Sequence, residues 1–203
     1  MSLGVGVLAS GEGSNLQAIL DRLHGHDGVQ VVGVGSDKPQ ARALARAQAA
    51  GVATHAFPVS AFADRTARDV AMADWLEAAG ASLVVLAGYM QLVTPEFLGR
   101  FPDRVVNVHP ALLPAFPGLQ AIEQGLAYGV KVFGVTVHLV DGGVDTGSIL
   151  AQRAVELLDA TEPEQVREAL RPVEHELLCG AVLAFARDAV RRDRAHARRV
   201  IVG

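Results

Sequence analysis

The stretch L-G-V-G-V-L-A-S-G-E-G-S-N, from Leu3 to Asn15, decides the fold. Its apolar run over 3–9 is typical of a buried strand, and the amphipathic segment over 15–23 predicts a helix directly after it. Apolarity that is continuous rather than alternating is typical of parallel strands that are covered on both faces. This strand–loop–helix unit therefore predicts the start of a doubly wound α/β fold.

The same alternation continues along the chain. A capping threonine and a proline at Thr94-Pro95 open a short helix. A second capping pattern, Thr161 with Glu164, opens a long helix that we expect to run to about Arg191, with a kink or break at Pro172. We expect one domain over residues 1–203, with a mostly parallel sheet flanked by helices in a Rossmann-like arrangement. The other expected strands are 29–35, 53–57, 83–86, 104–109, 132–140 and 148–155, and the other helices are 41–50 and 65–79.

Composition limits the function. The formal net charge is −4, and nucleic-acid binding normally needs a basic face, so we expect no nucleic-acid partner. The single cysteine, Cys179, excludes an intramolecular disulfide and a cysteine-rich metal site, and we expect it on the buried face of the last helix. One basic cluster is expected as a solvated helix end. It consists of Arg191, Arg192, Arg194, Arg198 and Arg199.

The sequence also indicates where the protein is located and whether it binds a metal. The first residues show neither a basic leader nor a cleavage site, and no apolar run reaches membrane-spanning length. We therefore expect a cytoplasmic protein without membrane contact. No residues have zinc or calcium spacing, so we expect no metal.

The loop A-S-G-E-G-S-N, residues 9–15, is the first candidate site. The backbone amides of Gly13, Ser14 and Asn15 would lie at a helix N-terminus, where they can bind an anion. A tight turn with a capping side chain explains the same residues equally well. A dinucleotide fingerprint would need a third glycine where Leu16 stands, although Asp37 after the second strand keeps that alternative open.

The stretch N-V-H-P-A-L-L-P-A-F-P-G, residues 107–118, is the second candidate site. Residues two apart in a strand share a face, so Asn107 and His109 point the same way at the end of their strand. Their side chains can both donate to an oxygen that gains negative charge, and the prolines that follow would fix the loop. The alternative is a histidine held by a hydrogen bond in the core.

A third candidate is His138 with the glycine-rich connection D-G-G-V-D-T-G. Asp145 stands between glycines, and a carboxylate near His109 would favour the imidazolium. An aspartate in an ordinary turn explains this motif equally well.

Together these stretches resemble the folate-dependent formyltransferase family over nearly the whole chain. The resemblance implies an enzyme that transfers the formyl group of 10-formyltetrahydrofolate to the amine of glycinamide ribonucleotide (GAR) in purine synthesis, without a metal. It implies these two small molecules as partners, and a homodimer is left open. The residues that carry it are G-E-G-S-N at 11–15, L-A-G-Y-M at 86–90, residues 107–118, and V-H-L-V-D-G-G-V-D-T-G at 137–147.

The resemblance also assigns roles. It makes Asn107 and His109 the groups that stabilise the oxyanion, and Asp145 the group that favours the imidazolium and helps to move protons. The GAR phosphate would bind at Gly13, Ser14 and Asn15, and Glu174 would bind the ribose hydroxyls. Arg171 stands where some members are uncharged, and we expect it to add to phosphate binding. The GAR phosphate side would lie in about 1–103, and the catalytic and folate side in about 104–203.

For the folate, the resemblance implies a site whose glutamate tail pairs with Arg65. Gln91 stands where some members have an arginine for that tail, so we expect weaker tail binding or reliance on Arg65. The resemblance also implies a cis Leu113–Pro114 bond. The other implied folate contacts are Met90, Leu92, Val93, Asn107, Val140 and Asp141.

Three alternatives remain. A formyltetrahydrofolate deformylase would use water as the acceptor but would not need G-E-G-S-N for a phosphate. A dinucleotide-binding protein would leave Asn107, His109 and Asp145 without a role. A non-catalytic folate or nucleotide sensor differs from the enzyme only in an assay.

Overall fold

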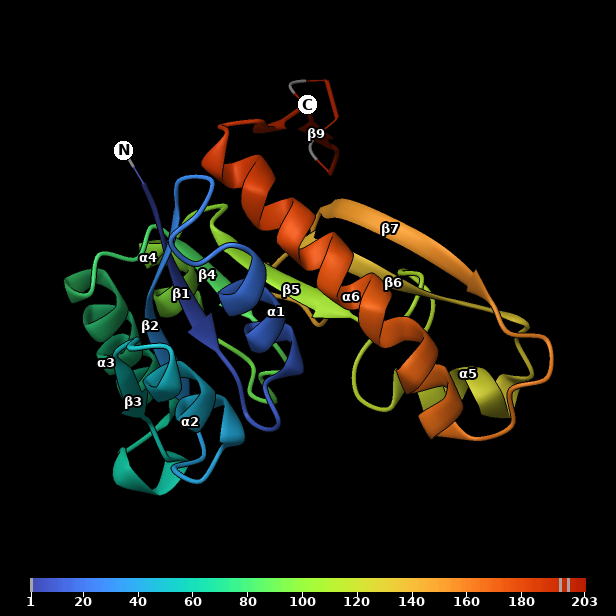
Figure 1. Ribbon diagram of the computed structural model, residues 1–203, viewed down its shortest axis with the longest axis horizontal. Helices are drawn as coiled ribbons and strands as arrows, with labels where there is room; N and C mark the ends of the chain where they lie inside the picture. Colours follow the sequence, from blue (N-terminus) through green and yellow to red (C-terminus); the bar gives the residue numbers. More distant parts are fainter. Residues whose placement is uncertain (1, 194, 197) are drawn as a thin grey trace.

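The computed structural model describes residues 2–193, 195–196 and 198–203, and a seven-stranded sheet forms its centre (Figure 1). The strand order is β3-β2-β1-β4-β5-β6-β7. The strands from β3 to β5 are parallel, whereas β6 and β7 are each antiparallel to the strand before them. The mostly parallel sheet is thus confirmed. The strands are β1 (Leu3–Leu8), β2 (Val29–Ser36), β3 (Thr54–Ala56), β4 (Leu83–Leu86), β5 (Val105–His109), β6 (Val132–Leu139) and β7 (Ile149–Glu156).

Helices cover both faces of this sheet (Figure 1). One core cluster joins the sheet to α1, α2 and α6, and a second joins its other face to α3 and α4. Both faces are buried, which is why the strands are apolar throughout rather than alternating. The helices are α1 (Ser14–Arg22), α2 (Arg42–Ala49), the 3-10 turn η1 (Val59–Ala61), α3 (Arg65–Ala78), α4 (Pro95–Arg100), α5 (Ala121–Tyr128) and α6 (Pro163–Ala186).

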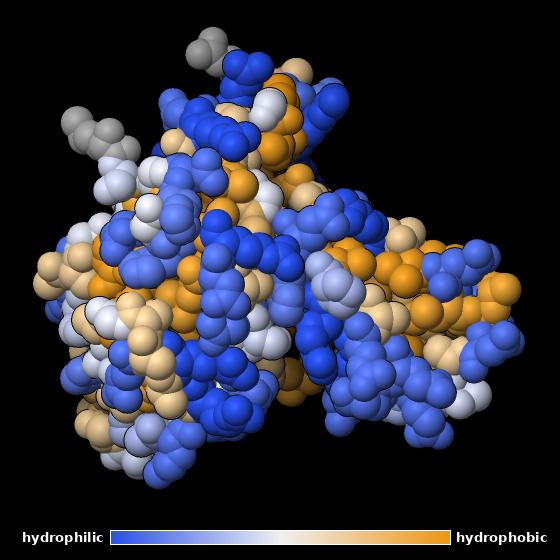
Figure 2. Space-filling view, in the orientation of Figure 1, coloured by the Kyte–Doolittle hydropathy of each residue, from blue (hydrophilic) through white to orange (hydrophobic). Residues whose placement is uncertain are grey.

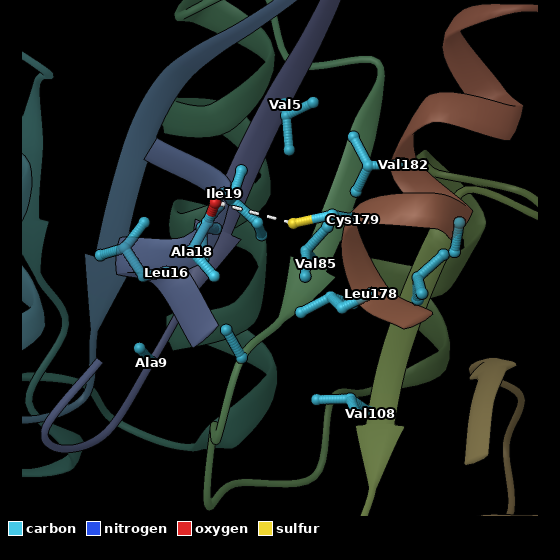
Figure 3. Close-up of a cluster of buried hydrophobic side chains, with 14 of the residues drawn as sticks. Val5, Ala9, Leu16, Ala18, Ile19, Val85, Val108, Leu178, Cys179 and Val182 are labelled. Atoms are coloured by element: carbon cyan, nitrogen blue, oxygen red, sulfur yellow. Dashed lines mark hydrogen bonds between the residues drawn. The ribbon is translucent and has the colours of Figure 1, made fainter. Parts of the chain in front are cut away.

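The contact between α1 and α6 is part of the larger core (Figure 3). Leu16 is fully buried there, so the position where a dinucleotide fingerprint needs glycine is a core position in this chain. Cys179 is 5% exposed, which confirms its place on the buried face of α6, and its Sγ donates to the carbonyl oxygen of Ala18 at 3.6 Å. Burial raises the pKa of the Cys179 thiol, although the Arg22 charge opposes that shift. This cysteine is therefore a packing residue.

The sheet brings the candidate motifs to one edge. The strand order reverses between β1 and β4, and ligands bind at the carboxyl edge of such a sheet beside the reversal. Leu86, at the end of β4, pairs in register with Asn107 of β5. The segments that follow β1, β4 and β5 therefore leave the sheet at the same edge. None of the helices in the described residues is long and apolar enough to cross a membrane.

Three expectations about α6 are wrong. The helix starts after Glu162, because Pro163 occupies its first position, and Gln165 Oε1 accepts the backbone N–H groups of Thr161 and Glu162. The capping pair is therefore Glu162 and Gln165 instead of Thr161 and Glu164. The helix continues through Pro172 without a break. It ends at Ala186 because Asp188 adopts a left-handed conformation with φ 53°, which stops a helix.

The basic cluster does not lie at a helix end. After Asp188 the chain forms a small hairpin of β8 (Val190–Arg192) and β9 (Val200–Val202). Arg192 of β8 pairs with Asp103, and Arg198 donates to the carbonyl oxygen of Thr146 at 2.6 Å. Arg194 lies outside the described residues. Arg192 and Arg198 therefore connect the hairpin to the loops that contain Asp103 and Thr146, a role that residue composition could not reveal.

Candidate active site

Asn107 and His109 lie at the carboxyl end of β5, on the same side of the strand as predicted. Pairing of β5 with β6 sets Asn107 directly opposite His138. His109 is 5% exposed and His138 is 1% exposed, so both rings lie within the protein. Two histidines and an amide are thus placed side by side by strand register.

Asp145 completes this group from the loop between β6 and β7. Its Oδ2 accepts the backbone N–H of Gly118 at 2.7 Å and lies 3.3 Å from Nδ1 of His109. Its Oδ1 accepts from Nδ2 of Asn107 at 3.3 Å and lies 3.4 Å from Nε2 of His138. Each carboxylate oxygen therefore faces two nitrogens. Asp145 has φ 52°, a conformation that aspartate tolerates better than most residues.

The ring nitrogens of the two histidines face different partners. Nε2 of His109 lies 2.8 Å from the carbonyl oxygen of Phe116, which can only accept, and Nδ1 faces the Asp145 carboxylate. Both ring nitrogens of His109 therefore have acceptors, an arrangement that fits the imidazolium. Nδ1 of His138 donates to the carbonyl oxygen of Leu139 at 2.8 Å. The neutral His138 ring can then accept from Asn107, and the protonated ring can donate to Asp145.

The electrostatics of Asp145 follow from these contacts. Burial would raise the pKa of the Asp145 carboxyl, but three groups outweigh burial and hold that pKa below its usual value. They are the hydrogen bond with His138, the hydrogen bond from the Gly118 amide, and His109. Asp145 is therefore ionised at neutral pH.

The loop before α1 places Gly13 directly before the first residue of that helix. Gly13 has φ 76° and precedes the first helical residue, and a Cβ at this position would lie 2.8 Å from the Cβ of Ala43. Only glycine meets both requirements, because other residues avoid this φ and would clash with α2. The side chain of Asn15 turns inward and is 8% exposed. The loop thus directs the N-terminus of α1 at the edge of the sheet.

Asn15 links α1 to α6 through Glu174. Nδ2 of Asn15 donates to Oε2 of Glu174 at 3.0 Å, while Oδ1 of Asn15 is buried without a protein partner. Burial raises the pKa of Glu174, against opposing effects of Asn15, Arg171 and His109. Arg171 is half-exposed and pairs with Glu164 at 3.6 Å.

The residues expected at the folate lie in two segments. Met90 and Leu92 are 57% and 54% exposed, which suits an apolar wall, and Val93 is half-buried. Gln91 is engaged within the protein, since it donates to Asp37 Oδ2 at 3.2 Å. Arg65 lies exposed at the start of α3.

The other segment is the loop after β6. Val140 is half-buried, and Asp141 folds the loop upon itself, accepting from the Gly143 amide and the Thr146 hydroxyl. The Leu113–Pro114 bond beside the site is cis, as the resemblance implied.

Three residues that hold the segment after β4 were not identified from the sequence. Ser10 accepts the backbone N–H of Met90 with its Oγ at 2.8 Å. Arg68 and Asp69 form a buried ion pair behind the same segment. Neighbouring opposite charges in a helix ordinarily indicate a solvated face, so the sequence carried no signal for this pair. Asp37 bonds to Gln91 here, which together with the buried Leu16 argues against a dinucleotide site.

The surface is hollowed between the part built on α1 and α2 and the part formed by α5 and the first half of α6 (Figure 2). Hydrophilic residues border this hollow. A different hollow of about 390 Å³ lies between the start of β7 and the C-terminal hairpin. The candidate active site does not lie in this second hollow, because neither Asn107 nor His109 is among its lining residues. Within the described residues, no group of three or more His, Cys, Asp or Glu side chains could hold a metal ion.

The α/β sheet thus carries an Asn-x-His strand end with a facing aspartate, next to a strand–loop–helix unit with Gly13 before α1. A model of the formyl transferase family matches residues 4–182, and the chain belongs to that family.

Particular relatives are similar over most of their length. The phosphoribosylglycinamide formyltransferase of Mycobacterium tuberculosis (strain CDC 1551 / Oshkosh) is 44% identical over 200 residues, covering 97% of this chain and 93% of that protein. The enzyme of the same name from Bacillus subtilis (strain 168) is 39% identical over 170 residues, 83% of this chain and 87% of the relative. The crystal structure of glycinamide ribonucleotide transformylase 1 from Symbiobacterium toebii matches with a TM-score of 0.94 at 44% identity, covering 99% of this chain and 94% of the other.

Proposed function

We propose that this chain transfers the formyl group of 10-formyltetrahydrofolate to the amine of 5′-phosphoribosylglycinamide, giving formyl-GAR and tetrahydrofolate in purine biosynthesis. The observation that carries the proposal is the group at the end of β5. There, Asn107 and His109 lie beside Asp145, and both nitrogens of His109 face acceptors.

In the proposed reaction, the GAR amine attacks the formyl carbon and forms a tetrahedral intermediate with a negatively charged oxygen. The imidazolium of His109 and the amide of Asn107 donate to this oxygen. The bond from carbon to the folate nitrogen then breaks, that nitrogen gains a proton, and the attacking amine loses one. Asp145 keeps His109 in its protonated form and orients its ring.

The donors at this site already have acceptors, so substrate must replace a contact. Nε2 of His109 donates to the Phe116 carbonyl, and Phe116 has φ 51°, which non-glycine residues seldom adopt. We propose that the formyl oxygen takes the place of the Phe116 carbonyl oxygen when the substrates bind.

GAR would bind between α1 and α6. The amides of Gly13, Ser14 and Asn15 would hold the phosphate at the positive end of α1. Glu174 would accept from the ribose hydroxyls, since its side chain is half-buried and its Oε2 accepts from Asn15. Arg171 would add a positive charge near the phosphate.

The folate would lie against the segment from Met90 to Val93 and the loop at Val140 and Asp141, next to Asn107. Because Gln91 is bonded to Asp37, the glutamate tail would rely on Arg65. In this arrangement residues of about 1–103 supply most of the phosphate side, and those of about 104–203 most of the catalytic side, of one domain.

The test is formyl transfer by the purified protein. GAR and 10-formyltetrahydrofolate are mixed with it, and deformylated folate and formyl-GAR are followed together. We expect the two products in equal amounts, with His109→Ala nearly inactive. His26→Ala is the matched control, since His26 is exposed in a loop away from β5, and it should keep wild-type activity.

Each other outcome points to a different function. Deformylation without formyl-GAR would make water the acceptor, as in a formyltetrahydrofolate deformylase. The absence of both products would contradict the proposal, and binding of folates and nucleotides would then be measured.

A further inference from the structure

A buried ion pair takes no part in the catalytic group. The side chains of Arg68 and Asp69, both in α3, are 1% and 0% exposed. Nε and Nη2 of Arg68 donate to Asp69 Oδ1 at 2.9 and 2.7 Å. Removing two charges from water is costly, so such a pair is weak support for stability, and its best attested use is to fix one arrangement among several.

The arrangement that this pair could fix is that of the wall segment, Met90–Thr94. Asp69 Oδ2 accepts the backbone N–H of Thr94 at 2.8 Å. Nη1 of Arg68 makes a long contact of 3.5 Å with Oε1 of Gln91, whose Nε2 donates to Asp37. The pair therefore reaches the wall segment through a backbone amide at its end and through a side chain within it.

The wall segment is also held at its other end. Ser10 is 3% exposed, and its Oγ accepts the Met90 amide at 2.8 Å. Between the two anchors, Met90 and Leu92 remain more than half exposed. The backbone is thus fixed at both ends while its apolar side chains face outward.

The contact between Asp69 and the wall segment requires a carboxylate, because its two oxygens accept from two different donor groups. Asp69 Oδ1 accepts from the guanidinium, and Oδ2 accepts from the Thr94 amide. An asparagine has only one acceptor oxygen, so it could serve one of them and would turn an NH₂ group toward the other.

We propose that Arg68 and Asp69 are positioning residues that set the wall segment before the folate binds. The inference rests on the proposed function of that segment. It also explains the use of Gln91, which donates to Asp37, directly after β2, and faces Arg68 of α3, and so links these two residues to the wall segment.

The first test uses Asp69→Asn in the full chain. We expect the Kd for tetrahydrofolate and the KM for the formyl donor to rise by about tenfold, with the KM for GAR and kcat within about twofold of wild type. Asp74→Asn is the matched control, because Asp74 lies in the same helix but forms an exposed pair with Arg100. That control should leave both folate constants unchanged.

The second test does not depend on activity. Hydrogen exchange of the Thr94 amide in the ligand-free protein should be at least about tenfold faster in Asp69→Asn than in wild type or Asp74→Asn. If Asp69→Asn does not fold, the variant Arg68→Lys is used instead. Lysine keeps the positive charge but lacks the planar guanidinium that donates two hydrogen bonds to Asp69. The folate constants should then rise about threefold.

The outcomes separate positioning from simple stability. A lower Tm with unchanged Thr94 exchange, or faster exchange with unchanged folate constants, would overturn the inference. A wild-type protein that does not bind tetrahydrofolate would overturn both the proposed function and the folate role of the wall segment. Wild-type formyl transfer with unaltered folate constants in Asp69→Asn would overturn the positioning role alone.

Discussion

The two carboxylates of the candidate active site, Asp145 and Glu174, differ in their hydrogen-bond partners and in the direction in which the protein shifts their pKa. Asp145, in the β6–β7 loop, faces four nitrogens, and the pKa of its carboxyl is lowered. Glu174, in α6, accepts from Asn15, and burial raises the pKa of its carboxyl. Beside it, Oδ1 of Asn15 is buried without a protein partner.

This difference in hydrogen bonding distinguishes the two regions of the candidate site. Around Asp145 the protein supplies its own hydrogen-bond partners, so this carboxylate is stabilised without a ligand. Around Glu174 polar groups are buried with few partners, which costs stability unless a ligand supplies donors. We infer that the β5–β6 region is organised for chemistry and that the α1–α6 region is organised for binding.

The largest effect should come from removing the Asp145 charge. Asp145→Asn should lower kcat by about 10²- to 10³-fold, because His109 loses the partner of its protonated form. The KM for GAR should change little. Asp188→Asn is the matched control, since Asp188 has the same left-handed backbone, φ 53°, and is exposed beyond α6. Steady-state kinetics of both variants check this, and equal losses of kcat would contradict it.

The same variant has a pH signature. Because the pKa of folded Asp145 is lowered, its carboxylate stabilises the fold above the ordinary value of 3.8, and this contribution is lost as the pH falls through the lowered pKa. The Tm of wild type should therefore be higher than that of Asp145→Asn at pH 7, and this difference in Tm should disappear below about pH 3.8. Thermal melts across this range test the sign.

An intermediate effect is expected on the binding side. Glu174→Gln should raise the KM for GAR by about tenfold, because an amide replaces the acceptor for the ribose hydroxyls. It should also raise Tm by about 2 to 4 °C at pH 7, the shift that about 1 kcal/mol gives in a protein of this size.

The pH dependence of that gain has the opposite sign. The pKa of Glu174 is raised, so its stability contribution is complete below the ordinary value of 4.5 and is lost as the pH rises through the raised pKa. The advantage of Glu174→Gln should therefore vanish below about pH 4.5. Glu176→Gln, at an exposed ion pair with Arg153, is the control. A lower Tm for Glu174→Gln than for wild type at pH 7 would contradict the binding role of this region.

The smallest effect concerns Arg171. Arg171→Ala should raise the KM for GAR by about three- to fivefold and leave kcat unchanged, because exposed charges contribute little. The difference from wild type should shrink in high salt. Arg167→Ala, one turn earlier and paired with Glu123 and Glu164, should leave the KM unchanged. An unchanged KM for GAR in Arg171→Ala would remove this residue from the phosphate site.

Local patterns were enough for much of the site. The two-residue period of a strand placed Asn107 and His109 on one side of β5, and the loop motif placed Gly13, Ser14 and Asn15 at the N-terminus of α1. The ends of α6 were predicted wrongly, because Pro163 moved the start and a left-handed Asp188 stopped the helix. Aspartate in that conformation has a weaker sequence signal than glycine.

The sequence by itself determined most elements of the seven-stranded sheet, because apolar period, capping residues and glycine conformation are properties of neighbouring residues, but it missed α5 and the β8–β9 hairpin. It did not determine how the polar groups pair. Asn15 and Glu174 are 159 positions apart, and Asn107 and Asp145 are 38 apart. Only the packing of α1 on α6, and of the β6–β7 loop over β5, brings them together. The same packing buries Arg68 with Asp69, since burial depends on which helix face meets the sheet and not on the charges themselves.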